Sequence, residues 1–508
     1  MRKQQRGQVV PMTLLFIGAV LLAMWVLYDT GALLSDRMRL QNTADHVAYS
    51  TAGLVARDLN FIAYTNRAMV ANQVGIAQMV GLSAWAASMG QFARNANTIG
   101  QFIPGINAIT GSVSTAAATN RQIIDQAAAV VIPVNDQVIG LLSDVQQLFH
   151  QSIVLQLSSF SADIGRRNDP DARSVMAAGD YSLAEAASLL AEWNEQIGQQ
   201  NTLRAVSSDD ADAQLANRRF REFEQVVIDS RDPFSANRSY QWDAPFSATW
   251  GVGLEIRTRT PKFGGTEFIR DVDPGDSTYR WDWVAMDTVS QYVQFCVDVV
   301  VGEECWDLPE IPLAWGAAHA LDESRSGVTR FDYRFSRSRG DPQRWGDGAW
   351  RNRAAASALL TSESPNPISG DHVHNRVAGI RGLQPFHALR EDTPRNRGPA
   401  VTALYIKDEN RMASQRQLMA ASGGEIVDEL DARAAGGLAG GRAGAVAKAE
   451  VYFMRPTDLD GWRRADNRVE YGNLYNPFWQ VRLVDLSDAE KLTASAIVSE
   501  GAMASPGD

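Results

Sequence analysis

Cysteine is scarce in this chain, because Cys296 and Cys305 are the only two among 508 residues. They do not form a C-x-x-C motif, which argues against a redox-active dithiol. An alternating apolar stretch carries Cys296, and Gly302 stands between the two cysteines, as in a hairpin turn. Closing so short a loop would contribute about 2–3 kcal/mol. We predict a disulfide, and two free thiols are the alternative.

Recognisable catalytic motifs are also missing. The chain contains no G-x-S-x-G, H-E-x-x-H or kinase-type motif. The glycine-rich stretch 434–445 lacks G-K-[ST] and comes before a predicted strand, which is typical of a linker and not of a phosphate loop. His372 and His374 would share one face of a strand, but a structural zinc site needs two further ligands. We predict no catalytic residue, no metal and no cofactor.

Charge is absent from residues 8–28, whereas Arg2, Lys3 and Arg6 precede them. A helix rises about 1.5 Å per residue, so this run matches the roughly 30 Å hydrocarbon core of a bilayer. We predict a basic cytoplasmic leader at 1–7, a transmembrane helix at 8–28 and the rest of the chain across the membrane. The alternative is a cleaved secretory signal, whose apolar region is normally shorter.

Apolar residues recur every seven positions after this run, at Ala48, Val55, Ile62, Met69 and Ile76. The spacing predicts a long helix with a packing seam, of which Val55, Ile62, Met69 and Ile76 form the centre. A second row lies four residues after the first. It contains Ala52, Leu59 and Val80, and the polar residues Asn66 and Gln73 interrupt it. Such a seam is expected to self-associate or to lie beside other helices.

Two further helical stretches are expected before the pattern changes. One covers about 112–162 and contains Pro133, which should kink or divide it. The other covers about 172–230, with a capping-box pattern at 182–185. We therefore assign residues 29–235 to a helical stalk.

Alternation typical of strands dominates residues 236–490. The clearest segments are at 252–260, 292–301, 331–335, 401–408, 447–454 and 478–486. Trp281 and Trp283 share one face of a strand-like segment and are expected in the core. Residues 491–508 are expected to form a tail. The predicted fold class is α+β: an N-terminal transmembrane helix continues into a helical stalk and is followed by a β-rich extracytoplasmic domain.

Arginine and aromatic residues alternate between 330 and 353. This composition can bind phosphates, bases or sugars. The candidate binding patch consists of Arg334, Arg337, Arg339 and Trp345. The alternative is a strand whose aromatic side chains lie in the core and whose arginines face solvent.

Arg6-Gly7 before the apolar run and Arg39-Leu40-Gln41-Asn42-Thr43-Ala44-Asp45 after it resemble the N-terminal segment of TadE/TadG-like proteins of Tad (Flp) pilus-assembly systems. Residues 66–78 and 470–483 resemble longer TadG-related proteins. Pilin-like members that are cleaved at the leader glycine carry a glutamate five residues after it. Met12 stands there in this chain, which argues against cleavage after Gly7. Residues 485–489 begin a D-x-S-x-S metal motif without completing it, so we infer no von Willebrand A-type domain.

The resemblance implies a non-enzymatic component of a Tad/Flp-type pilus assembly or secretion system. Such a protein would be a single-pass protein of the bacterial inner membrane, with its N-terminus in the cytoplasm and its bulk in the periplasm. Its partners would be pilus-assembly or envelope proteins, reached through helix–helix and envelope contacts. A net charge of −11 argues against nucleic acid as a partner. The alternative is a membrane-tethered module that binds or hydrolyses cell-wall material.

Overall fold

The structure is a computed structural model, and it describes most of the chain in separate ranges. These are residues 9–100, 107–174, 197–200, 211–244, 254–272, 279–299, 302–308, 311–321, 375–389, 396–408, 411–412, 442–456, 464, 466 and 468–500. The predicted binding patch, the histidines of 371–374 and the capping box at 182–185 lie outside the described residues.

Two long helices dominate the described part of the first 170 residues. They are α1, Val9–Gly100, and α2, Asn107–Asn168. The predicted transmembrane segment thus continues outward in one helix, as the heptad spacing indicated. Pro133 lies inside α2 without dividing it, so the predicted division is wrong. A proline in a helix interior costs about 3 kcal/mol. Tertiary contacts hold the helix together on both sides of Pro133, since Ile132 is buried and the buried Asp136 pairs with Arg381.

The chain forms two compact units, each assembled from separated segments. The first contains Met1–Tyr64, Gln147–Gly198 and His387–Asp508, and the second contains Thr65–Gln146 and Gln199–Phe386. Each unit combines helix and sheet, which confirms the α+β class. The division differs from the linear one into a stalk at 29–235 and a β-rich domain at 236–490, because each unit takes its helices from one part of the chain and its main sheet from another.

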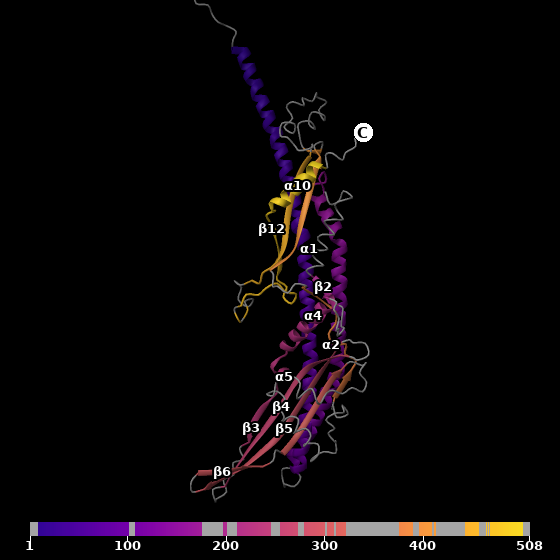
Figure 1. Ribbon diagram of the computed structural model, residues 1–508, viewed down its shortest axis with the longest axis vertical. Helices are drawn as coiled ribbons and strands as arrows, with labels where there is room; N and C mark the ends of the chain where they lie inside the picture. Colours follow the sequence, from indigo (N-terminus) through magenta and orange to yellow (C-terminus); the bar gives the residue numbers. More distant parts are fainter. Residues whose placement is uncertain are drawn as a thin grey trace, which may run out of the picture. The chain divides into compact units, whose positions relative to one another are not determined.

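In the first unit, four antiparallel strands pack on α1 (Figure 1). The sheet order is β1-β10-β11-β12, with bounds Arg173–Ser174, Arg397–Asp408, Arg442–Phe453 and Trp479–Val484. Small residues on β11 alternate with partly exposed ones and let the sheet approach the helix: Ala443, Ala445, Ala447 and Ala449 are buried in one core cluster with Ala48, Ala52, Val55 and Ile62 of α1.

In the second unit, strands β3 to β7 lie side by side as antiparallel neighbours, and the short β8 pairs with β7 in parallel (Figure 1). The order is β3-β4-β5-β7-β8, and β6 pairs with the remaining length of β5. The bounds are Tyr240–Ala244, Leu254–Val272, Tyr279–Val299, Gly302–Asp307, Ile311–Leu321 and Asn375–Ala378 for β3 to β8. Trp281 and Trp283 are both fully buried on β5, as predicted from their shared face.

Three shorter helices and a small sheet complete the described elements. The helices are α4, Ala211–Asp229, α5, Pro233–Ala236, and α10, Asp488–Glu500. Strands β2, Ile197–Gln200, and β9, Phe386–Leu389, form a two-stranded sheet.

Helix α10 corrects the tail predicted at 491–508, since residues 488–500 are helical. Its start is fixed by a capping box: the Ser487 backbone N–H donates to Glu490 Oε2 at 2.7 Å, and the Glu490 N–H donates to Ser487 Oγ at 3.3 Å. Ala494 packs on Leu404 and Ile406 of β10, which holds the helix on the sheet. The S-x-x-E pattern was present in the sequence and was the signal for this helix.

Gly316 on β7 is required by the close approach of that strand to α1. A Cβ atom built there would overlap the backbone of Ala84 and Ser88. We expect Gly316→Ala to destabilise the protein by about 1–3 kcal/mol, the usual cost of overpacking. Thermal unfolding of the detergent-solubilised protein measures the change. The control is Gly90→Ala inside α1, where the nearest side-chain atom, Arg121 Cδ, would lie at an ordinary 3.7 Å. That substitution should be neutral or stabilising, and equal melting shifts for both variants would contradict the packing argument.

Candidate functional site

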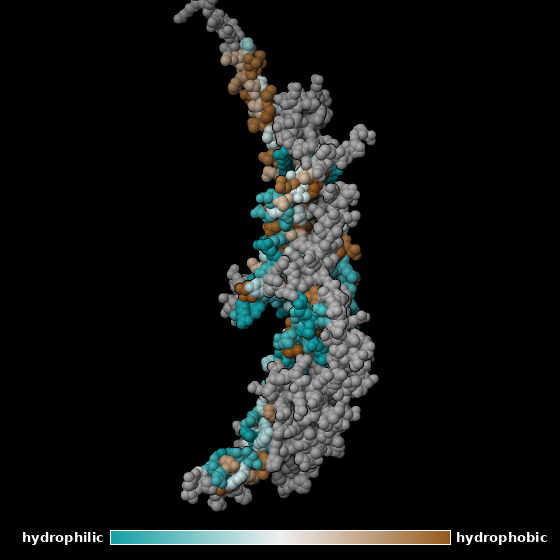
Figure 2. Space-filling view, in the orientation of Figure 1, coloured by the Kyte–Doolittle hydropathy of each residue, from teal (hydrophilic) through white to brown (hydrophobic). Residues whose placement is uncertain are grey.

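The first turns of α1 expose an apolar surface (Figure 2). Its large exposed side chains are Val10, Met12, Leu14, Leu15, Phe16, Ile17, Leu21, Leu22, Met24, Trp25, Val26, Leu27 and Tyr28. Two described helices are long and apolar enough to cross a membrane. In α1 the apolar window near the N-terminus is not buried at all, whereas 33% of the window in α2 is buried. The exposed start of α1 therefore has the properties of a membrane anchor.

Burial of α1 begins where this apolar surface ends. Asp29, Leu33, Asp36 and Leu40 are buried at helical spacing, so one face of the helix turns toward the sheet of the first unit. Charged residues on a buried face must be paired. Asp29 and Asp36 were the signal for such pairing in the sequence, and sequence reasoning missed it.

Lys407 on β10 is the partner of Asp36. Its Nζ lies 3.3 Å from Asp36 Oδ1 and 3.2 Å from Oδ2 of Asp169, the residue that follows α2. The lysine side chain is 2% exposed and that of Asp169 is fully buried. One ammonium group thus joins α1, the end of α2 and the sheet.

The residues that carry the family resemblance dock α1 on the same elements. Arg39 donates from Nε and Nη2 to the Asn168 carbonyl oxygen at 3.2 and 3.1 Å, which places a cation at the C-terminus of α2. Gln41 Nε2 donates to the Val446 carbonyl oxygen of β11 at 3.1 Å. Leu40 and Ala44 are buried in the core between helix and sheet. These four side chains thus hold α1 against the end of α2 and the sheet of the first unit.

The C-terminal motif at 470–483 contacts α1 as well. Asn60 Nδ2 donates to the Trp479 carbonyl oxygen at 2.9 Å, and the Trp479 backbone N–H donates to Asn60 Oδ1 at 3.0 Å. The indole Nε1 of Trp479 donates to the Asn473 carbonyl oxygen at 3.0 Å. A single asparagine thereby satisfies both backbone groups at the first residue of β12.

The first unit also contains a buried group of ionisable side chains, Asp58, His150 and His387. Asp58 Oδ2 is 2.7 Å from His150 Nδ1, and the rings of His150 and His387 are 4.8 Å apart. Burial raises the pKa of the Asp58 carboxyl, while hydrogen bonding to His150 opposes the shift. Burial lowers the pKa of His387 to about 3, and the charge of His150 acts in the same direction. His387 is therefore neutral at physiological pH.

The second unit has its own buried ion cluster. Arg238 Nη2 lies 2.9 Å from Asp287 Oδ2, and Lys262 Nζ pairs with Asp287 Oδ1. Burial lowers the pKa of Lys262, and the charge of Asp287 opposes the shift. All three side chains are enclosed by strands β3 to β5 and helix α5, so they hold these elements together.

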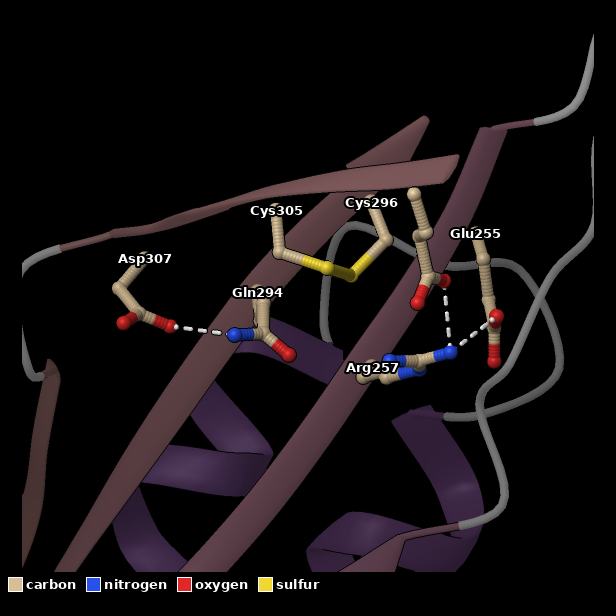
Figure 3. Close-up of a disulfide and its surroundings, with 7 residues drawn as sticks. Glu255, Arg257, Gln294, Cys296, Cys305 and Asp307 are labelled. Atoms are coloured by element: carbon tan, nitrogen blue, oxygen red, sulfur yellow. Dashed lines mark hydrogen bonds and ion pairs between the residues drawn. A yellow bond between two sulfur atoms is a disulfide. The ribbon is translucent and has the colours of Figure 1, made fainter. Parts of the chain in front are cut away.

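Cys296 and Cys305 form the predicted disulfide on the β5–β6 hairpin (Figure 3). They are direct partners in the strand register, with Cα atoms 4.0 Å apart. Gly302 has φ of +128° at the turn, a conformation that favours glycine. Arg257 lies beside the bridge and donates to Glu255 at 2.9 Å and to Glu303 at 2.7 Å. Because the sulfur atoms are joined, neither offers the thiolate that a metal ion would need.

The predicted seam is buried inside the chain. Val55, Ile62, Met69 and Ile76 are all fully buried, and the first two pack in the core shared by α1 and the sheet of the first unit. The surface that we expected to contact other helices is thus occupied by the chain itself.

The polar interruptions of the seam have partners within the second unit. Trp283 Nε1 donates to Gln73 Oε1 at 2.9 Å, and Gln73 Nε2 donates to the Gly382 carbonyl oxygen at 2.8 Å. Asn66 accepts from Gln146 of α2 at 2.9 Å. Amides at two seam positions therefore connect α1 to a sheet strand, a loop and α2.

Residues 7–54 match the model of a protein family described as putative Flp pilus-assembly TadE/G-like. The match covers the exposed apolar surface and the docking residues Asp36, Arg39 and Gln41, and it confirms the resemblance inferred from 39–45. No curated protein and no solved structure matches the chain. The resemblance of 470–483 to longer TadG-related proteins stays a prediction.

Removing the shared ammonium group should be costly. Lys407→Met leaves Asp36 and Asp169 facing each other in the core, and breaking such a buried pair costs about 3–5 kcal/mol. The matched control is Lys448→Met on the neighbouring strand, whose pair with Glu490 is partly exposed and should be worth at most about 1 kcal/mol. Denaturant unfolding in detergent measures the free energy of unfolding of both variants. A similar loss of free energy in Lys407→Met and Lys448→Met would refute the role of Lys407.

His387 should make the stability of the first unit depend on pH. Its pKa in the folded chain lies below the unfolded value of about 6.5, so only the unfolded chain takes up a proton as pH falls below 6.5. The free energy of unfolding should therefore drop by about 1.4 kcal/mol between pH 7.5 and pH 5.5 on account of this residue.

The variant His387→Gln should lose that part of the pH dependence, whatever its stability at pH 7.5. His46→Gln changes an exposed histidine and should retain the whole dependence. Denaturant titrations at pH 7.5 and pH 5.5 measure the free energy of unfolding of each variant. If His387→Gln loses as much free energy between the two pH values as the unsubstituted protein, the buried imidazole is not responsible for the pH dependence.

Proposed function

We propose that this protein is a non-enzymatic, membrane-anchored component of a Tad/Flp-type pilus assembly or secretion system. The observation that carries the proposal is the segment 7–54. It matches the pilus-assembly family, and within it the single helix α1 passes from an exposed apolar start to a face that is buried against the sheet. The anchor would hold the two compact units at the membrane, where they present surfaces to pilus-assembly or envelope proteins.

Within the part of the chain that the structure describes, the surroundings of Asp58, His387 and Asp287 favour a non-enzymatic role. Asp58 and His387 have shifted pKa values, as a catalytic pair would need. Their side chains are nevertheless enclosed, with exposed fractions of 0% and 3%, so a substrate could not reach them in this conformation. Asp287 is likewise buried between two cations of its own chain.

The topology we propose places the N-terminus in the cytoplasm and the bulk of the chain in the periplasm of the inner membrane. Basic residues before an apolar helix stay on the cytoplasmic side. The disulfide agrees with this orientation, because such bonds persist in oxidising compartments.

Release from the membrane should abolish the function. A chain that lacks the residues before Asp29 and is exported by a cleavable signal keeps the buried part of α1. We expect it to leave a strain that lacks the native protein without surface pili, because the contacts require the protein at the membrane. Counting pili by electron microscopy measures the effect.

The control carries an unrelated single-pass helix in place of residues 9–28 and should restore at least half of the pili. An enzyme that acts on cell-wall material would still work when released into the periplasm. Full restoration by the released chain would therefore contradict the proposed role.

A further inference from the structure

Helix α2 bears an apolar stripe that faces away from the core of the protein. Val131, Val134, Leu141 and Val145 are 37%, 52%, 62% and 48% exposed, and Val138 between them is half-buried. Leu148 and Leu155 continue the spacing along the same helix, with 67% and 79% exposed. The opposite face of α2 contributes Ile132, Ile139 and Ile153 to the interior.

The stripe follows the heptad spacing of a coiled coil from Val131 to Leu155, and Ser152 is the one polar residue at its a and d positions. Val131, Val138 and Val145 occupy one position of the heptad, called a. Val134, Leu141, Leu148 and Leu155 occupy the position three residues later, called d. Valine at a combined with leucine at d favours two parallel strands. In a parallel assembly these residue types therefore favour two helices over three or four.

The flanks of the stripe carry almost no charge. The g positions are Gln137, Asp144 and Gln151, and the e positions are Asn135, Leu142, Phe149 and Gln156. In a parallel pair, each g position faces the e position five residues later on the partner, so Asp144 faces Phe149 of the partner subunit. No like charges oppose each other in a pair of identical helices.

We propose that two copies of this chain associate through the a and d stripe of α2 as a parallel two-stranded coiled coil. The parallel direction rests on the proposed function, because copies anchored in one membrane by the same N-terminal helix have the same orientation. The exposed Gln137, Asp144 and Gln151 lie along the edge of the stripe and favour a partner helix in water over lipid. The seam of α1 is occupied within the chain and does not compete.

Cysteine cross-linking of the full-length protein in native membranes tests the pair. Identical d positions face each other across a parallel pair, so Leu141→Cys and Leu148→Cys should each give a disulfide-linked dimer under a mild oxidant. Gln126→Cys is the matched control on the same helix, exposed but at a c position away from the stripe. We expect at least five times more dimer from the two d variants than from the control.

A second measurement uses association in detergent, followed by analytical ultracentrifugation. Leu141→Asp combined with Leu148→Asp should raise the dissociation constant at least tenfold. Both side chains are largely exposed, so the fold should survive, as unchanged thermal unfolding would verify. Equal cross-linking of all three cysteine variants, or an unchanged dimer in the double aspartate variant, would overturn the proposal. Pilus counts are read separately: a chain that cross-links at 141 and 148 but plays no part in pilus assembly refutes only the proposed function.

Discussion

Burial of one face of α1 is the constraint on which both compact units depend. From Asp29 onward the helix supplies part of each core, and small residues on the strands allow backbones to approach it closely. Ala447 and Ala449 do so in the first unit, and Gly316 does so in the second. A Cβ atom added at Gly316 would overlap the backbone of α1, so the residue at this contact follows from the distance between strand and helix.

Polar groups on this buried face decide which segments lie opposite each turn of α1. Asn60 pairs with the backbone of Trp479, and Gln73 joins Trp283 to Gly382. Lys407 of β10 pairs with Asp36 and so places that strand opposite the turn of α1 that contains Asp36. A hydrophobic contact tolerates a shift along the helix, but an unpaired buried amide or carboxylate costs about 1–3 kcal/mol or more. These pairs therefore specify the register of helix and sheet more than they increase stability.

Helices α1 and α2, most of the strand segments and the disulfide could be predicted from local sequence. The helical stretch predicted at about 172–230 is only partly right, because β1 and β2 are strands within it and the helix there, α4, covers Ala211–Asp229. The strand predicted at 331–335 lies outside the described residues. Heptad spacing and the turn glycine between the cysteines are local signals, and the structure has the corresponding elements. Pro133 and α10 were misjudged because tertiary packing outweighs the intrinsic cost of a proline and because the capping box of Ser487 and Glu490 was overlooked. The partner of Asp36 is Lys407, which is 371 residues away, and no local pattern can indicate such a pairing.

Heptad periodicity alone also does not indicate whether an apolar helix face is covered by the same chain or by another molecule. The seam of α1 and the stripe of α2 have the same spacing, yet strands of the same chain cover the first, while the second remains exposed. The difference lies in the rows themselves: Asn66 and Gln73 in the second row of the seam form hydrogen bonds with particular partners in the chain, whereas the stripe of α2 contains only valine and leucine between 131 and 148. A seam with buried amides selects its own sheet, and a purely aliphatic heptad can accept any helix with the same pattern, of which a second copy of α2 is one.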